Sequence, residues 1–340
     1  MLGQTLINHI ILKKNPGKKI DHQIIEKKPA FFNMATCHSY TRMKTFNYDA
    51  MINNTSAFHF VPACRGKSFP KMLRCFKESP VIIGILNEAL KDSNLVKFGM
   101  VLHPYADTFS HQGFSGLLCK VNDIKDCIAH TTVQGGRIKK IIKFFRSLFG
   151  SKFDRYFDKL MPAYGHGQAF DYPDLPYLTW SYYYDYSDQF SSAFKHSDLI
   201  DNKERFRQAF EAIRKYLKQY LSKHSQYQDK DVKFNDFDLL FSSLVKADTD
   251  ENRIRNWQRV MINNNLFSRG DRQLEYKKHA WIKAAFLNFD EKKFDQRTVD
   301  EVDLLPDFEN SLWYQYYLAA KWYQEEFFKH CKKNKLIIPR

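Results

Sequence analysis

Apolar side chains recur every three or four residues along much of the chain, which is the spacing of an amphipathic helix. The pattern is clear between Phe206 and Leu221 and again between Trp313 and Tyr323. Residues 81–102 are almost continuously apolar and predict a buried helix that runs into His103. No segment alternates convincingly between apolar and polar residues, as a half-buried strand does. The pattern therefore predicts an all-α fold.

The same pattern gives a simple organisation. Residues 1–30 are basic and weakly patterned, and we interpret them as an N-terminal extension. Residues 31–334 are expected to form a single large helical domain, with a subdivision near residue 195 left open. Residues 161–180 are rich in Gly, Pro and aromatic residues, which predicts a long ordered loop that packs over another part of the protein.

The net charge adds a preference for anionic partners. Lys and Arg number 53 against 38 Asp and Glu, which gives a formal charge of +15. This surplus favours an anionic substrate, a phospholipid or membrane surface, or nucleic acid. Nucleic acid is the weakest of these, because no nucleic-acid-binding motif accompanies the charge. The cationic amphipathic segment 137–148 could lie on a membrane surface, although such a stripe more often docks on the protein's own core.

Cysteines and termini restrict the compartment. The six cysteines include no C-x-x-C pair, so a disulfide framework or a zinc ribbon is not expected. The N-terminal residues lack the features of a signal peptide, and no apolar run is long enough to cross a bilayer. We expect a cytoplasmic protein, or one exported without a classical signal peptide.

The densest group of chemically capable residues is the segment HPYADTFSH, His103–His111. Residues four apart on a helix differ by about 40° in direction, so His103, Asp107 and His111 form one stripe about 80° wide. Imidazole nitrogens and a carboxylate oxygen on a rigid support are typical ligands of zinc. The alternative is that the histidines are ordinary hydrogen-bonded residues and that Asp107 pairs with a base.

The stripe is too long for one ion, because its outer members lie about 12 Å apart along the axis. It therefore indicates either one pair completed by ligands from elsewhere, or an elongated cluster of two or three metals with Asp107 bridging. Pro104 disfavours helical geometry at His103, so the helix is expected to kink or begin there.

Further candidate ligands lie outside this segment. They are His38, His59 and His166, each a lone histidine in sequence, and His166 is open to approach because glycines flank it. Asp107 and Asp174 are the candidate catalytic carboxylates, Asp174 as a group that orients water, with Asp171 as the other candidate for that role.

Several motifs of other enzyme classes are missing. The sequence has no P-loop, no G-x-G-x-x-G, no G-x-S-x-G and no H-E-x-x-H. Nucleotide-driven phosphoryl transfer and serine-hydrolase chemistry are therefore disfavoured.

Three segments resemble those of an uncharacterised bacterial family. They are FHFVP (Phe58–Pro62), LHPYADTFSHQGFSG (Leu102–Gly116), and GHGQA (Gly165–Ala169) followed by YPDLPYLTW (Tyr172–Trp180). The resemblance extends from about Phe31 into the Asp248–Trp257 region. Because the family has no established activity, it supports a shared fold and site more than a function.

The pair His103-x3-Asp107 is also loosely similar to a helical group of zinc-dependent phospholipases C and single-strand nucleases. There a His-x3-Asp pair binds two ions of a trinuclear zinc cluster, and the enzymes hydrolyse phosphodiesters. The later His-x3-Glu or His-x3-Asp pair of that group has no counterpart here, nor has its N-terminal metal-binding segment.

Two functions follow from these observations. The first is a zinc-dependent hydrolase of a phosphodiester, with phospholipid as the substrate class that the resemblance implies. The alternative is a non-catalytic helical binding protein or secreted effector, a degenerate member with one metal or none.

Overall fold

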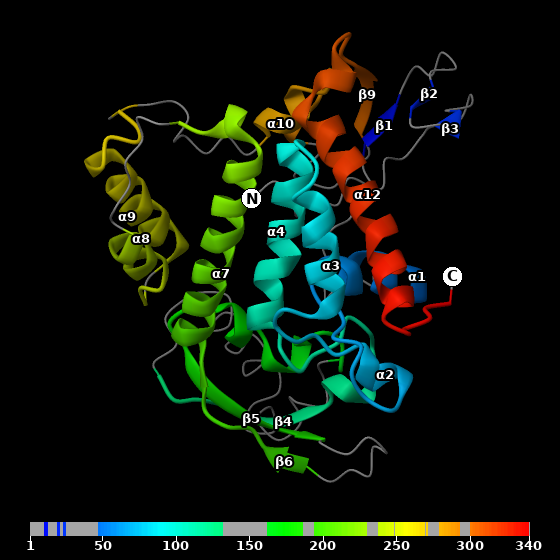
Figure 1. Ribbon diagram of the computed structural model, residues 1–340, viewed down its shortest axis with the longest axis vertical. Helices are drawn as coiled ribbons and strands as arrows, with labels where there is room; N and C mark the ends of the chain where they lie inside the picture. Colours follow the sequence, from blue (N-terminus) through cyan, green and yellow to red (C-terminus); the bar gives the residue numbers. More distant parts are fainter. Residues whose placement is uncertain are drawn as a thin grey trace.

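Helix α4 (Leu95–Ser110) is the central helix and packs against three others, α3 (Pro80–Ala89), α7 (Asn202–Lys223) and α12 (Leu312–Lys333) (Figure 1). The computed structural model describes residues 10–12, 19–20, 23–24, 47–131, 162–185, 194–229, 237–247, 249–268, 270, 279–292 and 300–339. The described residues also form the α-helices α1 (Tyr48–Ala50), α2 (Phe69–Met72), α8 (Phe237–Leu244), α9 (Asp250–Asn263) and α10 (Ala280–Lys283). One π-helix, η2 (Met51–Ser56), follows α1. Short 3₁₀ turns are η3 (Lys120–Asn122), η5 (Gly167–Ala169), η6 (Tyr172–Asp174), η7 (Ser225–Tyr227) and η9 (Phe308–Asn310).

Polar side chains at the starts of the long helices explain where these helices begin. Ser79 accepts a hydrogen bond from the backbone of the first turn of α3, and Asn94 does the same for α4. Asp201 and Ser311 cap α7 and α12 in the same way. Each cap satisfies backbone N–H groups that have no partner inside the helix.

The prediction of an all-α fold is wrong, because the chain also forms sheets and is a mixed α/β protein. Strands β4 (Ile124–Ala129), β5 (Thr179–Asp185) and β6 (Phe194–His196) are antiparallel, and β7 (Ile200–Asp201) pairs with β5. A second sheet has the order β1 (Ile10–Leu12), β9 (Asp300–Leu304), β8 (Phe286–Leu287), and β2 (Lys19–Ile20) pairs with β3 (Gln23–Ile24). The long-loop prediction for residues 161–180 is also corrected at its end, since Thr179 and Trp180 open β5.

The missed sheet has a physical explanation. In β4 only Ile124 is buried, so the strand shows no apolar alternation. In β5 the consecutive residues Trp180, Ser181 and Tyr182 are all buried, so this strand shows none either. Cross-strand pairing and packing of aromatic residues, which a periodicity count does not detect, determine this sheet.

Pro104 lies inside α4, so the helix does not begin at His103 as one alternative had it. The apolar run before it is also divided, since α3 ends at Ala89 and α4 begins at Leu95.

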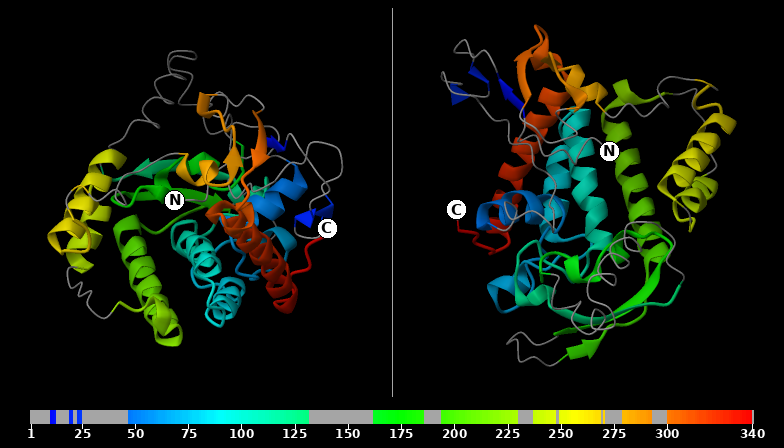
Figure 2. Two further views of the ribbon diagram at one scale, coloured as in Figure 1. Left: turned by 90° about the horizontal axis from the view of Figure 1, so that it is seen from above. Right: turned by 180° about the vertical axis from the view of Figure 1, so that it is seen from behind.

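Two apolar clusters lie on either side of the candidate site. The larger fills the space between α3, α4, α7 and α12 and includes Tyr105, Trp313 and Tyr323. The smaller lies between the end of α4 and the β4–β5–β6 sheet, with Phe60 and Trp180 among its members. Figure 2 shows the sheet across one end of the helices, and α8 and α9 on the side of α7 that faces away from α4. In the part of the chain described here, no helix has the length and apolar character to cross a bilayer.

The packing of α3 on α12 gives a stability prediction. Gly84 faces the buried ring of His330, and a Cβ at this position would lie 2.2 Å from His330 Nδ1. Gly84→Ala is therefore expected to lower the free energy of unfolding by about 1–3 kcal/mol, through overpacking. Urea unfolding measures this change.

Gly99→Ala is the matched control, because nothing lies within 4 Å of its Cβ position in α4. It is expected to raise stability by up to about 1 kcal/mol, since alanine favours helix over glycine. Equal effects of the two substitutions would contradict the packing argument.

Candidate metal centre

The end of α4 supplies half of the candidate ligands. His103 and Asp107 lie one turn apart on the helix, and His111 is the residue that caps it. The His111 N–H donates to the Asp107 carbonyl at 2.9 Å, which continues the helical hydrogen bonding to the cap. All three side chains of the sequence-derived stripe therefore start from one rigid support, but they do not converge on one point.

Site 1 comprises His59, His103 and Asp107. His59 Nδ1 donates to Asp107 Oδ2 at 2.9 Å, and His103 Nε2 lies 3.5 Å from the same oxygen. His59 comes from the end of the helical segment that follows η2, where its N–H donates to the carbonyl of Thr55. The three side chains offer one ligand atom each within 4.8 Å of one another, so they could hold a metal ion.

Site 2 comprises His111, His166 and Asp174. His111 Nε2 lies 3.0 Å from Asp174 Oδ1, and His166 Nε2 lies 3.4 Å from Asp174 Oδ2. His166 precedes η5 and Asp174 ends η6, so two tight turns of the aromatic loop bring these ligands to α4. Its three ligand atoms also lie within 4.8 Å of one another, so it is a second group in the described part of the chain that could hold a metal ion.

Backbone carbonyls orient both imidazoles of site 2. His111 Nδ1 donates to the carbonyl of His59 at 2.8 Å, and His166 Nδ1 donates to that of Phe170 at 2.5 Å. Each bond assigns the proton to Nδ1 and leaves Nε2 facing Asp174, as in protein metal sites where a second group orients the ligand. Phe170 has φ +52° and ψ −135°, a conformation that costs a non-glycine residue about 1–3 kcal/mol.

The two sites are adjacent. His111 Nδ1 lies 3.9 Å from Asp107 Oδ2, and its hydrogen bond to the His59 carbonyl ties site 2 to a ligand of site 1. Asp107 and His111 differ by about 6 Å along the helix axis, which sets the spacing of the sites. Phe60, next to His59, stacks on the ring of His111 with 4.8 Å between the centroids.

The carboxylates carry negative charge into this region. Burial alone would raise the pKa of Asp107, but His103, His111 and the hydrogen bond from His59 lower it to about 2. Partial burial opposes ionisation of Asp174 as well, yet His166 and His111 lower its pKa to about 2. Both groups are ionised at neutral pH and are suited to bind a cation.

The imidazoles differ in charge. Burial disfavours the charged form of His111, but Asp107 and Asp174 raise its pKa to about 9. Burial lowers the pKa of His103 and of His166, despite the nearby carboxylates. These two are therefore neutral at pH 7, which is the form that binds metal.

Both sites have an open side. The side chain of Asp174 is 48% exposed and that of His103 is 33% exposed, whereas His59, His111 and His166 are buried. A metal site with three protein ligands and an accessible position is the arrangement found in catalytic rather than structural zinc sites.

The structure brings together most of the sequence-derived candidates. His59, His103 and Asp107 meet in one group, and His111, His166 and Asp174 in the other. His38 lies outside the described residues. Asp171 belongs to neither group and precedes η6. The sequence indicated that the stripe is too long for one ion, but it did not show which residues complete each group, because three of the six ligands come from turns without a recognisable metal-binding spacing.

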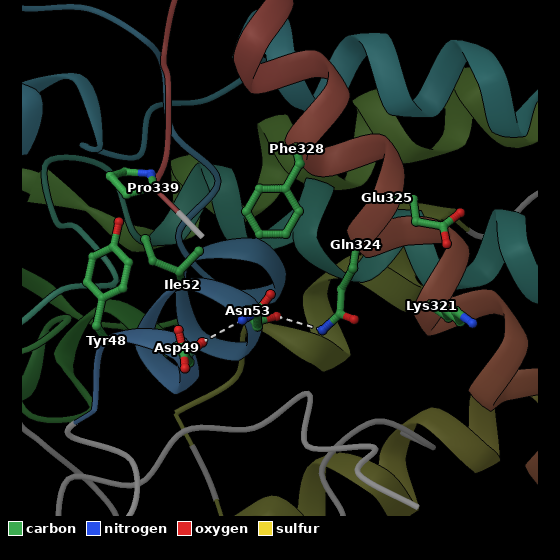
Figure 3. Close-up of a pocket in the computed structure, with 9 residues that line it drawn as sticks. All are labelled: Tyr48, Asp49, Ile52, Asn53, Lys321, Gln324, Glu325, Phe328 and Pro339. Atoms are coloured by element: carbon green, nitrogen blue, oxygen red, sulfur yellow. Dashed lines mark hydrogen bonds between the residues drawn. The ribbon is translucent and has the colours of Figure 1, made fainter. Parts of the chain in front are cut away.

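A separate cavity of about 290 Å³ lies between the first helical segment and α12 (Figure 3). Its polar groups pair with one another: Asn53 donates to the carbonyl of Asp49, and Gln324 donates to that of Asn53. None of the six candidate ligands lines this cavity, so it is not part of the metal centre.

The charge on His111 gives a pH prediction for protein treated with a chelator. A histidine whose pKa rises to about 9 on folding stabilises the fold fully below about pH 6.5, and this contribution disappears as the pH rises through 9. The stability advantage of the wild type over His111→Gln is therefore expected to shrink by up to about 3 kcal/mol between pH 6.5 and 9. Urea unfolding at several pH values measures it, and a constant difference would contradict the assignment.

No curated protein sequence and no solved structure matched the chain. The looser similarity to zinc-dependent phospholipases C therefore stays a prediction from the sequence. A model of a family of unknown function, DUF6765, matches residues 14–331. Because this range covers well over half of the 340 residues, the chain belongs to that uncharacterised family.

Proposed function

We propose that site 1 and site 2 each bind a zinc ion and that the protein is a metal-dependent hydrolase of a phosphodiester. The observation that carries the proposal is the pair of adjacent His₂Asp groups, one turn of α4 apart, with open sides at His103 and Asp174. Hydrolytic metal sites commonly use two neighbouring ions to stabilise the attacking and leaving oxygens of a phosphate ester.

The donor set supports zinc. Two imidazole nitrogens and one carboxylate oxygen per site are typical ligands of a catalytic zinc ion, which keeps a further position for water. The same set also suits Fe(II), so the metal is assigned by elemental analysis. A zinc ion at such a site lowers the pKa of bound water towards neutrality.

Charge supports an anionic substrate. Each site contributes one carboxylate and two neutral histidines when it binds a divalent cation, so each loaded site keeps a net charge of +1. The chain as a whole has a surplus of 15 positive charges. Phospholipid is the substrate class we propose first, because it combines a phosphodiester with an anionic surface.

One observation favours the alternative, a binding protein without catalysis. Both carboxylates are already hydrogen-bonded to imidazoles, Asp107 to His59 and Asp174 to His111. These pairs satisfy the carboxylates without an ion, so metal content and hydrolytic activity together separate the two functions.

Elemental analysis of protein purified without added metal is expected to give about two zinc ions per chain. The double variants His103→Ala/Asp107→Ala and His166→Ala/Asp174→Ala are each expected to lose about one of these ions. His196→Ala, which changes a histidine of β6 outside both sites, is the control and should keep both. Absence of bound metal in the wild type would refute the metal centre.

Hydrolysis of bis(p-nitrophenyl) phosphate and of phosphatidylglycerol vesicles tests catalysis. Chelation is expected to abolish activity and zinc to restore it, and Asp174→Asn should lower kcat at least about 100-fold, the loss typical of a perturbed metal ligand shell. A protein that binds two zinc ions but hydrolyses neither substrate would favour the non-catalytic alternative.

A further inference from the structure

A cavity of about 530 Å³ lies where the turn after α4 meets β5 and the start of α7. Its size is that of a small-molecule site. Gln112, Gly113 and Phe114, which follow His111 directly, form part of its wall. The lining also includes aromatic rings, which belong to Phe76, Phe114, Tyr182 and Tyr184.

Arg205 brings a positive charge to this wall. It lies on the first turns of α7, and its Nη1 donates to the carbonyl of Ser110 at 3.1 Å. Burial lowers its pKa, and the titratable groups that act on it are Tyr182 and Cys75 rather than a carboxylate. In the described part of the chain this guanidinium forms no ion pair.

Arg74 is a second arginine in the same wall. Its Nε is buried and has no hydrogen-bond partner among the described residues. Arg74, Arg205 and Tyr182 line this one cavity, and both guanidinium groups oppose the rise in the pKa of Tyr182 that its burial causes. Two guanidinium groups that line one cavity without an ion pair favour an anion between them.

The hydroxyl of Tyr182 lies beside Gly113, another residue that lines this cavity. It would be 3.0 Å from a Cβ at Gly113, whose φ of +92° suits glycine. The ring stacks on Phe114 and Trp180, which fixes the direction of the hydroxyl. This group makes no hydrogen bond with the described protein, so it can donate to a ligand.

The cavity also has carboxylates, but they lie on its exposed side. Asp201 caps α7, Glu204 accepts a hydrogen bond from Gln208, and Asp198 is exposed. None of the three forms an ion pair with Arg74 or Arg205 in the described structure. The positive charge therefore lies deeper in the cavity than the negative charge.

We propose that Arg74, Arg205 and Tyr182 bind a phosphate-type oxyanion in this cavity. Two guanidinium groups and a phenol supply the charge-assisted and neutral donors that a tetrahedral oxyanion accepts, and arginine favours such anions by its planar fork. The aromatic walls accommodate an organic group attached to the phosphate, so an organic phosphate is the ligand class.

This oxyanion site is distinct from the metal centre but next to it. Phe114 separates them, since its ring lies 5.6 Å from that of Tyr182 and 6.2 Å from that of His166. Arg205 donates a hydrogen bond to the carbonyl of Ser110, the residue before His111. The oxyanion site shares no residue with site 1 or site 2, so it does not depend on the proposed hydrolase activity.

Calorimetric titration of the protein as purified, with inorganic phosphate and with phenyl phosphate, tests the proposal. Arg205→Ala and Arg74→Ala are each expected to weaken phenyl phosphate binding roughly 10- to 100-fold, as for loss of a charged hydrogen bond. Tyr182→Phe, which keeps the ring, should weaken it by roughly 3- to 10-fold. Tighter binding of phenyl phosphate than of phosphate would assign the site to organic phosphates, and equal binding to free phosphate.

Arg207→Ala is the matched control, because Arg207 lies on the same helix but stacks on Phe241, away from the cavity. It should leave binding unchanged. Arg205→Lys keeps the charge and most of the packing, so it reports on the guanidinium fork if the alanine variant unfolds.

Repeating the titration with EDTA separates this site from the metal centre. Binding at Arg74 and Arg205 should persist when metal is removed. Binding that disappears with EDTA and does not change in Arg205→Ala would assign phosphate to the metal sites and overturn the proposal. Absence of binding to the wild type, or an equal loss in Arg207→Ala, would overturn it as well.

Discussion

The half-buried carboxylate of Asp107 is the group on which the candidate centre depends. It stands on the central helix, it accepts a hydrogen bond from His59, and His103 and His111 lie within 4 Å of it. An ionised carboxylate in this position is stable only with positive charge or several donors around it. The surrounding histidines supply both, and their positions in turn fix the segment after η2 against the end of α4.

The sequence allowed a good part of the site to be predicted, because the His103–Asp107–His111 spacing is a property of one helix. The division into two groups could not be predicted in the same way. His59, His166 and Asp174 reach α4 through turns, and tight turns such as that at Phe170 leave no periodic signal. A stripe too long for one ion did indicate ligands from elsewhere, without showing which residues they were.

The fold shows a similar limit. Apolar spacing correctly predicted helices α7 and α12. However, the apolar stripe from Phe206 to Leu221 is not the most buried face of α7. Ala209 and Tyr220 are buried, whereas Phe210 packs against Phe241 of α8. Apolar spacing identifies a helix and cannot tell which of two neighbours each side of it contacts. The sheet was missed because β4 has one buried residue and the aromatic strand β5 is buried at consecutive positions, so neither alternates. The all-α prediction failed where packing rather than pattern determines structure.

The turn from Ser110 to Phe114 connects the two chemically capable regions. His111 is a ligand of site 2, and the carbonyl of Ser110 accepts a hydrogen bond from Arg205. The ring of Phe114 lies between those of His166 and Tyr182. A group bound at the arginines therefore lies one aromatic ring away from the ligands of site 2. Any substrate with two anionic groups separated by a short spacer would match this arrangement better than a compact anion would.

The two regions are also alike in that each attracts an ion of the opposite charge. The negative charges of Asp107 and Asp174 attract a cation, and a proton on His111 or a metal ion can serve, but not both at the same imidazole. Arg74 and Arg205 attract an anion, because among the described residues neither forms an ion pair with the carboxylates on the exposed side of the cavity. The two sides of Phe114 therefore attract ions of opposite charge, and this difference is the physical reason to expect ligands at both.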